Sequence, residues 1–129
     1  MIFVDSNIPM YLVGGPHANR DRATAFLRQN PAEQLVTSAE VYQEVIHRYV
    51  SIDRREAIAD AFRVLDDLVV TVFPVTRSDV GLAEGLVATH PGLSSRDCLH
   101  LAVMRGRGVR RALTFDQGFA RHTDIAVLP

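Results

Sequence analysis

The strongest constraint on the fold is that short apolar segments alternate with segments of helical periodicity along the chain. Strands separated by helices are typical of a parallel sheet with helices on both faces. The sequence therefore predicts an α/β fold, a three-layer α/β/α sandwich with a central, mainly parallel sheet that has an edge near the C terminus. The apolar and β-branched runs that predict its strands are residues 1–4, 35–37, 69–75, 111–115 and 125–128.

Capping signals and side-chain spacing predict the helices. Thr37-Ser38-Ala39-Glu40 has the form of a capping box, which accounts for Glu40 structurally, and Asp53 can cap the next helix. Residues 38–69 are thus predicted to form a helical hairpin. Ser94 to Asp97 repeats the capping pattern before residues 99–104, which are apolar on most sides and predict a central, buried helix.

Size and composition are those of an ordinary globular domain. The 129 residues carry a formal charge of -1, and a chain of this length buries roughly two thirds of the surface that it exposes when unfolded. We expect a single domain over residues 1–129, held together without disulfides, with the one cysteine, Cys98, buried. The N terminus does not have the pattern of a signal peptide, and no apolar run approaches about 18 residues, so we expect a cytoplasmic protein without membrane contact.

The basic residues restrict the chemistry, because all 14 are arginine and lysine is absent. A P-loop, a Schiff-base enzyme and a phospho-aspartyl receiver each use a lysine, so these classes are excluded. The sequence also lacks HExxH, GxSxG, GxGxxG and paired cysteines. Carboxylates, histidines and arginines remain as candidates for function.

Four carboxylates are predicted to meet at one edge of the sheet. In an open parallel sheet, ligands bind outside the carboxyl ends of the strands. Asp5 follows the first strand and Asp116 follows the strand at 111–115. Asp97 opens the buried helix, and Glu44 lies two turns into the helix after the second strand. On this topology all four converge on one crevice.

Each of these acids also has a purely structural interpretation. Asp5 and Asp116 can be N-caps, Asp97 can belong to a capping box, and Glu44 can pair with Arg48 at i+4. The set as a whole favours a metal site, since carboxylates gathered in a crevice repel one another until a divalent cation neutralises them. Mg²⁺ and Mn²⁺ prefer oxygen ligands, and such a site suits phosphodiester hydrolysis.

The same residues carry a resemblance to the PIN-domain family. Val4-Asp5-Ser6-Asn7 resembles its N-terminal signature, and the helix after Thr37-Ser38 carries Glu44 at the usual place. Residues 96–102, Arg-Asp-Cys-Leu-His-Leu-Ala, resemble the third acidic motif, and residues 113–119, Leu-Thr-Phe-Asp-Gln-Gly-Phe, resemble the fourth. The match is ordered and spans nearly the whole chain. Compact PIN domains of this length are most similar to VapC-type toxins of bacterial toxin–antitoxin pairs.

The resemblance implies an endoribonuclease that depends on Mg²⁺ or Mn²⁺, is usually a homodimer, and is inhibited by a small VapB-type antitoxin from the adjoining gene. By motif position, Asp5 and Asp97 would be the principal metal ligands. Glu44 and Asp116 would complete the catalytic acidic cluster, directly or through water, and one of them would orient the attacking water.

Further residues would have supporting roles in such an enzyme. Asn7 and Thr114 would be polar residues behind the metal ligands, and Ser6 is an additional candidate. A groove on the hairpin of residues 38–69 would receive an amphipathic antitoxin segment. Contacts to RNA phosphates must come from arginine, although a solvated helix end explains the same cations. The candidates are Arg96, Arg105 and Arg107, with Arg110 and Arg111 nearby.

Two other protein classes stay open at this point. Glu44 and His47, and likewise Asp97 and His100, lie one helical turn apart as in di-iron bundle proteins, but such a site needs long helices throughout. Otherwise both histidines are core or surface residues, and His100 can hydrogen-bond near the cluster. The non-enzymatic alternative is a nucleic-acid- or partner-binding module with an inactive acidic cluster, which crowded carboxylates without a metal would destabilise.

Overall fold

The computed structural model describes residues 1–129 and contains a five-stranded sheet in the order β3-β2-β1-β4-β5. All four strand pairs are parallel. The predicted α/β sandwich is confirmed, and the last strand lies at an edge of the sheet as expected. The strands are β1 (Ile2–Val4), β2 (Leu35–Ser38), β3 (Thr71–Phe73), β4 (Arg111–Leu113) and β5 (Ala126–Leu128).

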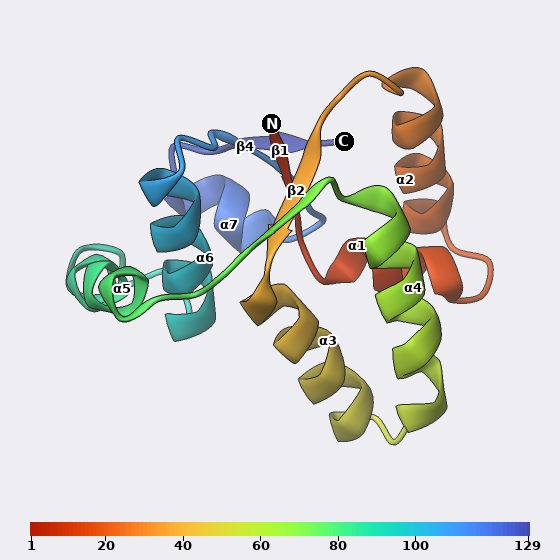
Figure 1. The fold of residues 1–129 in the computed structure, drawn as a ribbon, viewed down its shortest axis with the longest axis horizontal. Coiled ribbons are helices and arrows are strands. Elements are labelled where there is room, and N and C mark those ends of the chain that lie inside the picture. Colours follow the sequence, from red (N-terminus) through yellow and green to blue (C-terminus); the bar gives the residue numbers. More distant parts are fainter.

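Seven helices cover the two faces of this sheet (Figure 1). From β1 the chain adds β2 and then β3 on one side of β1, and it then returns to add β4 and β5 on the other side. Because connections between parallel strands are right-handed, the helices before β3 and those after β3 lie on opposite faces of the sheet. One layer contains α1 (Asn7–Val13), α2 (Ala18–Gln29), α3 (Ala39–Ser51) and α4 (Ile58–Leu68), with a short 3₁₀ turn at Arg55–Ala57. The other contains α5 (Arg77–Thr89), α6 (Ser95–Gly106) and α7 (Gln117–His122).

The core lies between the central strands and α6. Every residue of β1 and β2 is buried, as continuous apolar strands of a parallel sheet require. Six residues of α6 are buried, Cys98 among them, which confirms the prediction of a central helix. None of the seven helices is both long enough and apolar enough to cross a membrane.

Two predicted helix caps are wrong, although α3 and α4 confirm the helical hairpin. Thr37 lies inside β2, and its hydroxyl donates to the Val4 carbonyl at 2.8 Å instead of capping α3. Glu40 forms an ion pair with Arg96 at 3.4 Å. Asp53 has a positive φ of 57° in the turn after α3 and caps no helix. In each case a tertiary contact or the tight turn outweighs the local capping signal.

The bond from Thr37 links the two central strands, and its loss has a measurable cost. Thr37 is fully buried, so Thr37→Val leaves a buried carbonyl without this donor. We expect the free energy of unfolding to fall by about 1–2 kcal/mol in urea denaturation. The matched change Thr71→Val, on the exposed edge strand, should alter it by less than about 0.5 kcal/mol. Equal effects of the two substitutions would contradict a structural role for the Thr37 hydroxyl.

A buried ion pair ties α6 to α5 and to the segment after β3. Asp79 completes the capping box of α5 with Thr76 and is buried. Its carboxylate accepts hydrogen bonds from Arg107, at 2.6 and 3.1 Å. The Arg107 guanidinium also donates to the Pro74 carbonyl and lies 5.4 Å from the centre of the Phe73 ring. Arg107 is therefore a structural residue.

Candidate active site

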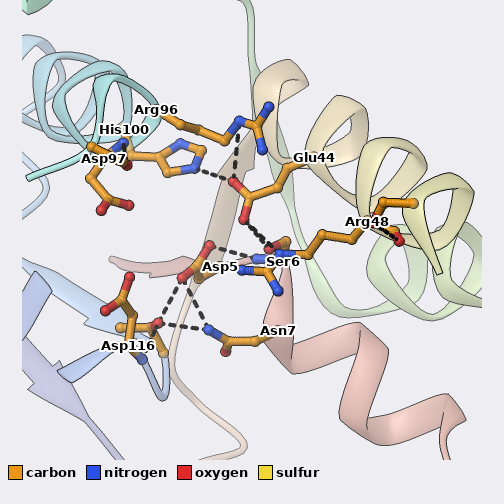
Figure 2. A network of polar contacts seen from close by, with 12 residues as sticks. Asp5, Ser6, Asn7, Glu44, Arg48, Arg96, Asp97, His100 and Asp116 are labelled. Carbon is orange, nitrogen blue, oxygen red and sulfur yellow. Dashed lines mark hydrogen bonds and ion pairs between the residues drawn. The ribbon is translucent and has the colours of Figure 1, made fainter. Parts of the chain in front are cut away.

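The four predicted acids line one pocket at the carboxyl edge of the sheet. Its volume is about 590 Å³, and it lies where the chain order reverses between β1 and β4. Asp5 follows β1, Asp116 precedes α7, Asp97 lies in the first turn of α6, and Glu44 projects from α3. Figure 2 shows the four side chains turned towards a common space from these separate elements. The structure thus brings all four together.

Asp5 is held in a fixed orientation by its neighbours. The Thr114 hydroxyl donates to Asp5 Oδ2 at 2.6 Å, and Asn7 Nδ2 donates to the same oxygen at 3.2 Å. The backbone N–H of Ser6 donates to Oδ1 at 2.7 Å. Asn7 also bridges to Thr114 and accepts a bond from the backbone of Phe115. The two predicted supporting residues therefore lie against Asp5, where they fix its rotamer.

Glu44 is the most buried of the four acids, with 7% of its surface exposed. The Ser6 hydroxyl donates to its Oε1 at 2.6 Å, and His100 Nε2 lies 3.0 Å from Oε2. Burial by itself would raise the pKa of Glu44, but the hydrogen bonds from His100 and Ser6 outweigh it and lower the pKa to about 2. The predicted i+4 ion pair with Arg48 is present, with Arg48 Nε 3.4 Å from Glu44 Oε1. The Glu44 carboxylate nevertheless lines the pocket and is not only a partner of Arg48.

Asp97 and Asp116 lie on the opposite side of the pocket from Glu44 (Figure 2). Burial raises the pKa of Asp97, a hydrogen bond with Ser94 opposes this, and the charges of Asp116 and Asp5 raise it further. Asp116 caps α7 as predicted, through bonds from Gly118 and Phe119 to Oδ1. These caps leave Asp116 Oδ2 free. The raised pKa of Asp97 thus comes mainly from burial, with a further contribution from the acids beside it.

His100 is a member of the site that the sequence identifies only as a candidate hydrogen-bonding partner. It is 3% exposed and has no partner for Nδ1. Burial would lower the pKa of His100, whereas the bond to Glu44 and the charges of Asp5, Glu44 and Asp97 raise it. A proton on Nε2 suits the contact with an ionised carboxylate. His47 is exposed on α3, and the central sheet replaces the long bundle that a di-iron site needs.

Removal of the His100 side chain is expected to destabilise the fold. His100→Leu leaves the buried carboxylate of Glu44 with one donor fewer, at a cost of about 2–3 kcal/mol in urea denaturation. His100→Gln keeps an N–H donor and should cost less. His47→Leu, an exposed imidazole on α3, is the matched control and should be nearly neutral. A stable His100→Leu protein would show that Glu44 does not depend on this bond.

The donor set of the pocket fits a divalent cation. One ligand atom each from Asp5, Glu44 and His100 lies within 4.8 Å of the others, and Asp97 and Asp116 line the same space. Carboxylate oxygens are the ligands that hard divalent cations prefer. The charges of Asp5 and Asp116 raise the pKa of Asp97, so a cation bound among the three carboxylates would reduce the repulsion between them.

The predicted arginines are distributed differently. Arg96 lines the pocket, with its Nε 3.4 Å from Glu40 and 3.8 Å from Glu44. Arg105 pairs with Asp124 at 2.9 Å and Arg107 with Asp79, so the structure does not bring either to the pocket. Arg111, which lies near these candidates in the sequence, forms a bidentate pair with Glu33 and does not line the pocket.

Five residues that line the pocket were not predicted as site residues. Ser94 and Ser95 lie at the start of α6, and the other three are Arg48, Tyr11 and Phe115, which come from other parts of the chain. These last three carry a positional signal, since Arg48 follows Glu44 by one helical turn, Tyr11 follows Asn7 by one turn, and Phe115 lies between Thr114 and Asp116. Position alone does not separate them from residues of an ordinary helix face or strand end.

Comparison with known proteins agrees with this geometry. A family model described as PIN domain matches residues 2–125. Ribonuclease VapC13 of Mycobacterium tuberculosis is 46% identical over 127 residues, which cover 97% of both chains. Ribonuclease VapC23 of the same species is 43% identical over 122 residues, 93% of this chain and 96% of the relative.

Solved structures show the same architecture. M. tuberculosis VapC20, described as a sarcin-ricin loop cleaving toxin, superposes with a TM-score of 0.82 and 25% identity over the whole of both chains. A toxin–antitoxin complex from Klebsiella pneumoniae superposes with a TM-score of 0.69 and 17% identity, covering 100% of this chain and 97% of the other. The second similarity establishes the fold alone.

Proposed function

The chain belongs to the PIN-domain family and to its VapC ribonucleases, and on that premise we propose that it is a divalent-metal-dependent endoribonuclease. The observation that carries the proposal is the convergence of Asp5, Glu44, Asp97 and Asp116 on one pocket. Their number and spacing exceed what helix capping requires, and Asp97 has a raised pKa because of burial and of its acidic neighbours.

We assign each side chain a part in RNA hydrolysis. Asp5 and Asp97 would hold the cation, Mg²⁺ or Mn²⁺, with Glu44 and Asp116 binding directly or through water. When bound, the cation lowers the pKa of water and neutralises charge on the phosphate. Thr114 and Asn7 keep Asp5 in one rotamer, and Ser6 and His100 do the same for Glu44. Asp116 Oδ2, which the caps of α7 do not use, would accept a hydrogen bond from the attacking water.

Arginines of the pocket wall supply positive charge for the RNA backbone. Arg48 projects from α3 and Arg96 from α6, and both line the pocket beside the acids. A guanidinium contacts phosphate oxygens through two parallel N–H groups, which orients the scissile phosphodiester. Since the whole chain has a formal charge of -1, these local cations and the bound metal provide the attraction.

The biological role that follows is that of a growth-inhibiting toxin, acting on cytoplasmic RNA and neutralised by a VapB-type antitoxin. A second groove of about 370 Å³ lies beside the active site and shares Asn7, Tyr11 and Arg48 with it. Its apolar wall includes Met10 of α1 and Ile52 after α3, which suits an amphipathic antitoxin segment. We further propose a homodimer, as in the toxins that the chain resembles.

The test is cleavage of a total cellular RNA pool by the purified protein. With Mn²⁺ or Mg²⁺ we expect discrete products, and in the presence of EDTA we expect none to form. The preferred metal is the one that gives faster cleavage. Products that persist in EDTA would contradict the proposal. RNA binding without cleavage in either metal would favour a binding module with an inactive acidic cluster.

A further inference from the structure

The active-site pocket has one aromatic wall that the hydrolytic chemistry does not use. Of the 11 residues that line the pocket, only Tyr11 and Phe115 are hydrophobic. Both are half-buried, and Phe115 also packs against the edge of the main core. The Tyr11 hydroxyl makes no hydrogen bond within the protein. An aromatic surface in so polar a pocket therefore calls for a ligand with an apolar face.

The two rings pack against each other. Their centroids lie 5.4 Å apart at an interplanar angle of 82°, an edge-to-face arrangement. His17 lies against Tyr11 with ring centroids 4.8 Å apart, and the Arg22 guanidinium lies 5.3 Å from the centre of the Phe115 ring. His17 and Arg22 do not line the pocket, so they support the rings from outside it.

The pair is coupled to the acids by the backbone. Phe115 immediately precedes Asp116, so their Cα atoms are about 3.8 Å apart. Its backbone N–H donates to Asn7 Oδ1 at 3.2 Å, and Asn7 in turn bonds to Asp5. Tyr11 lies one helical turn beyond Asn7. A phosphate at the acidic cluster would thus have aromatic surface in the same pocket.

We propose that Tyr11 and Phe115 form a stacking platform for one unpaired base next to the scissile phosphate, in which the base stacks on the face of one ring and meets the other ring edge-on. This inference rests on the proposed ribonuclease function and names the two residues that would contact a base beside the cleavage position. Bases within an A-form helix are stacked on one another, whereas bases of loops, bulges and ends stack on protein aromatic rings. Arg48 and Arg96 provide the complementary contacts to the backbone.

The experiment is a double-mutant cycle that combines substitutions of the two rings with removal of single bases from the RNA. The measured quantity is the affinity for RNA. Asp97→Asn protein, in which cleavage is expected to be about 10³-fold slower, is titrated with a short unpaired RNA in Mn²⁺. An abasic residue is introduced at each position of the RNA in turn. We expect one position at which loss of the base weakens binding about 10- to 100-fold. With Tyr11→Leu and Phe115→Leu in the same protein, that abasic change should have little further effect, because ring and base belong to one contact.

Matched variants separate stacking from folding. Tyr11→Phe keeps the ring and should retain the position-specific loss. Tyr42 forms a similar edge-to-face pair with Phe62 at 4.9 Å but lies outside the pocket, so Tyr42→Leu should leave the abasic profile unchanged. Circular dichroism and the urea midpoint establish that each variant is folded.

The outcomes distinguish this inference from the function on which it rests. If wild type cleaves RNA in Mn²⁺ but the fold-losses of affinity from the abasic change and from the ring substitutions simply multiply, the platform is refuted and the ribonuclease proposal stands. If the cycle shows coupling but wild type cleaves nothing, the base site stands and the ribonuclease proposal fails. Equal cleavage of duplex and unpaired versions of one target sequence also refutes the platform.

Discussion

Asp97→Asn is expected to lower metal-dependent RNA cleavage by about 10³-fold while raising the thermal stability of the metal-free protein. Asparagine keeps the size of the side chain but removes one of the charges that would hold the cation and stabilise the transition state. Because Asp116 and Asp5 contribute to the raised pKa of Asp97, the same substitution relieves repulsion in the folded state. Loss of function and gain of stability in one variant distinguish a metal-binding acid from a structural one.

Two measurements check this expectation. Single-turnover cleavage gives the rate, and thermal unfolding with and without Mn²⁺ gives the stabilisation by the metal, which should shrink in the variant. Asp60→Asn is the matched control, since Asp60 is an exposed acid of α4 paired with Arg63. Cleavage by Asp97→Asn at the wild-type rate, or an equal loss in Asp60→Asn, would remove Asp97 from the catalytic cluster.

Arg107→Met is expected to destabilise the fold by about 3–5 kcal/mol. The variant leaves the buried carboxylate of Asp79 without the guanidinium that donates to both of its oxygens. Arg105→Met is the matched control, because Arg105 pairs with the exposed Asp124, and it should cost less than about 1 kcal/mol. The double variant Asp79→Asn with Arg107→Met removes both charges and should recover part of the loss.

Acid pH should reveal the same ion pair. The Arg107 hydrogen bonds outweigh burial and lower the pKa of Asp79 to about 2 from its ordinary value of 3.8. A carboxyl with a lowered pKa stabilises the fold above its unfolded pKa and loses this as pH falls through the folded value. Wild type should therefore lose about 2 kcal/mol between pH 4 and pH 2 that Arg107→Met lacks. Parallel pH profiles for the two proteins in urea denaturation would contradict this assignment.

The elements that the sequence predicts well are those set by local pattern. Strand runs, the helical hairpin and the buried α6 depend on the periodicity of apolar side chains over a few residues. The rule that strand ends form the site then brought Asp5 and Asp116 together without any knowledge of side-chain contacts. The resemblance to PIN domains is confirmed by the family match over residues 2–125.

The features that escaped prediction depend on partners far along the chain. Arg107 binds Asp79, 28 residues away, and Arg111 binds Glu33, 78 residues away. The Thr37 hydroxyl donates to the carbonyl of Val4, 33 residues away, and does not cap the helix that follows it. A run of arginines in the sequence shows that positive charge is concentrated there, but it does not show which carboxylate each guanidinium faces in the fold. Such a run is therefore compatible with contacts to RNA and equally with ion pairs inside the protein.

The strand order also sets when activity can arise during synthesis. Asp5 is oriented by Thr114, 109 residues later, and β1 pairs with β4 as well as with β2. Until β4 has left the ribosome, the sheet lacks a central strand and the pocket lacks Asp116. A nascent chain that carries the first three acids therefore lacks the complete pocket, and we expect RNA cleavage to begin only after β4 and Asp116 have emerged and folded.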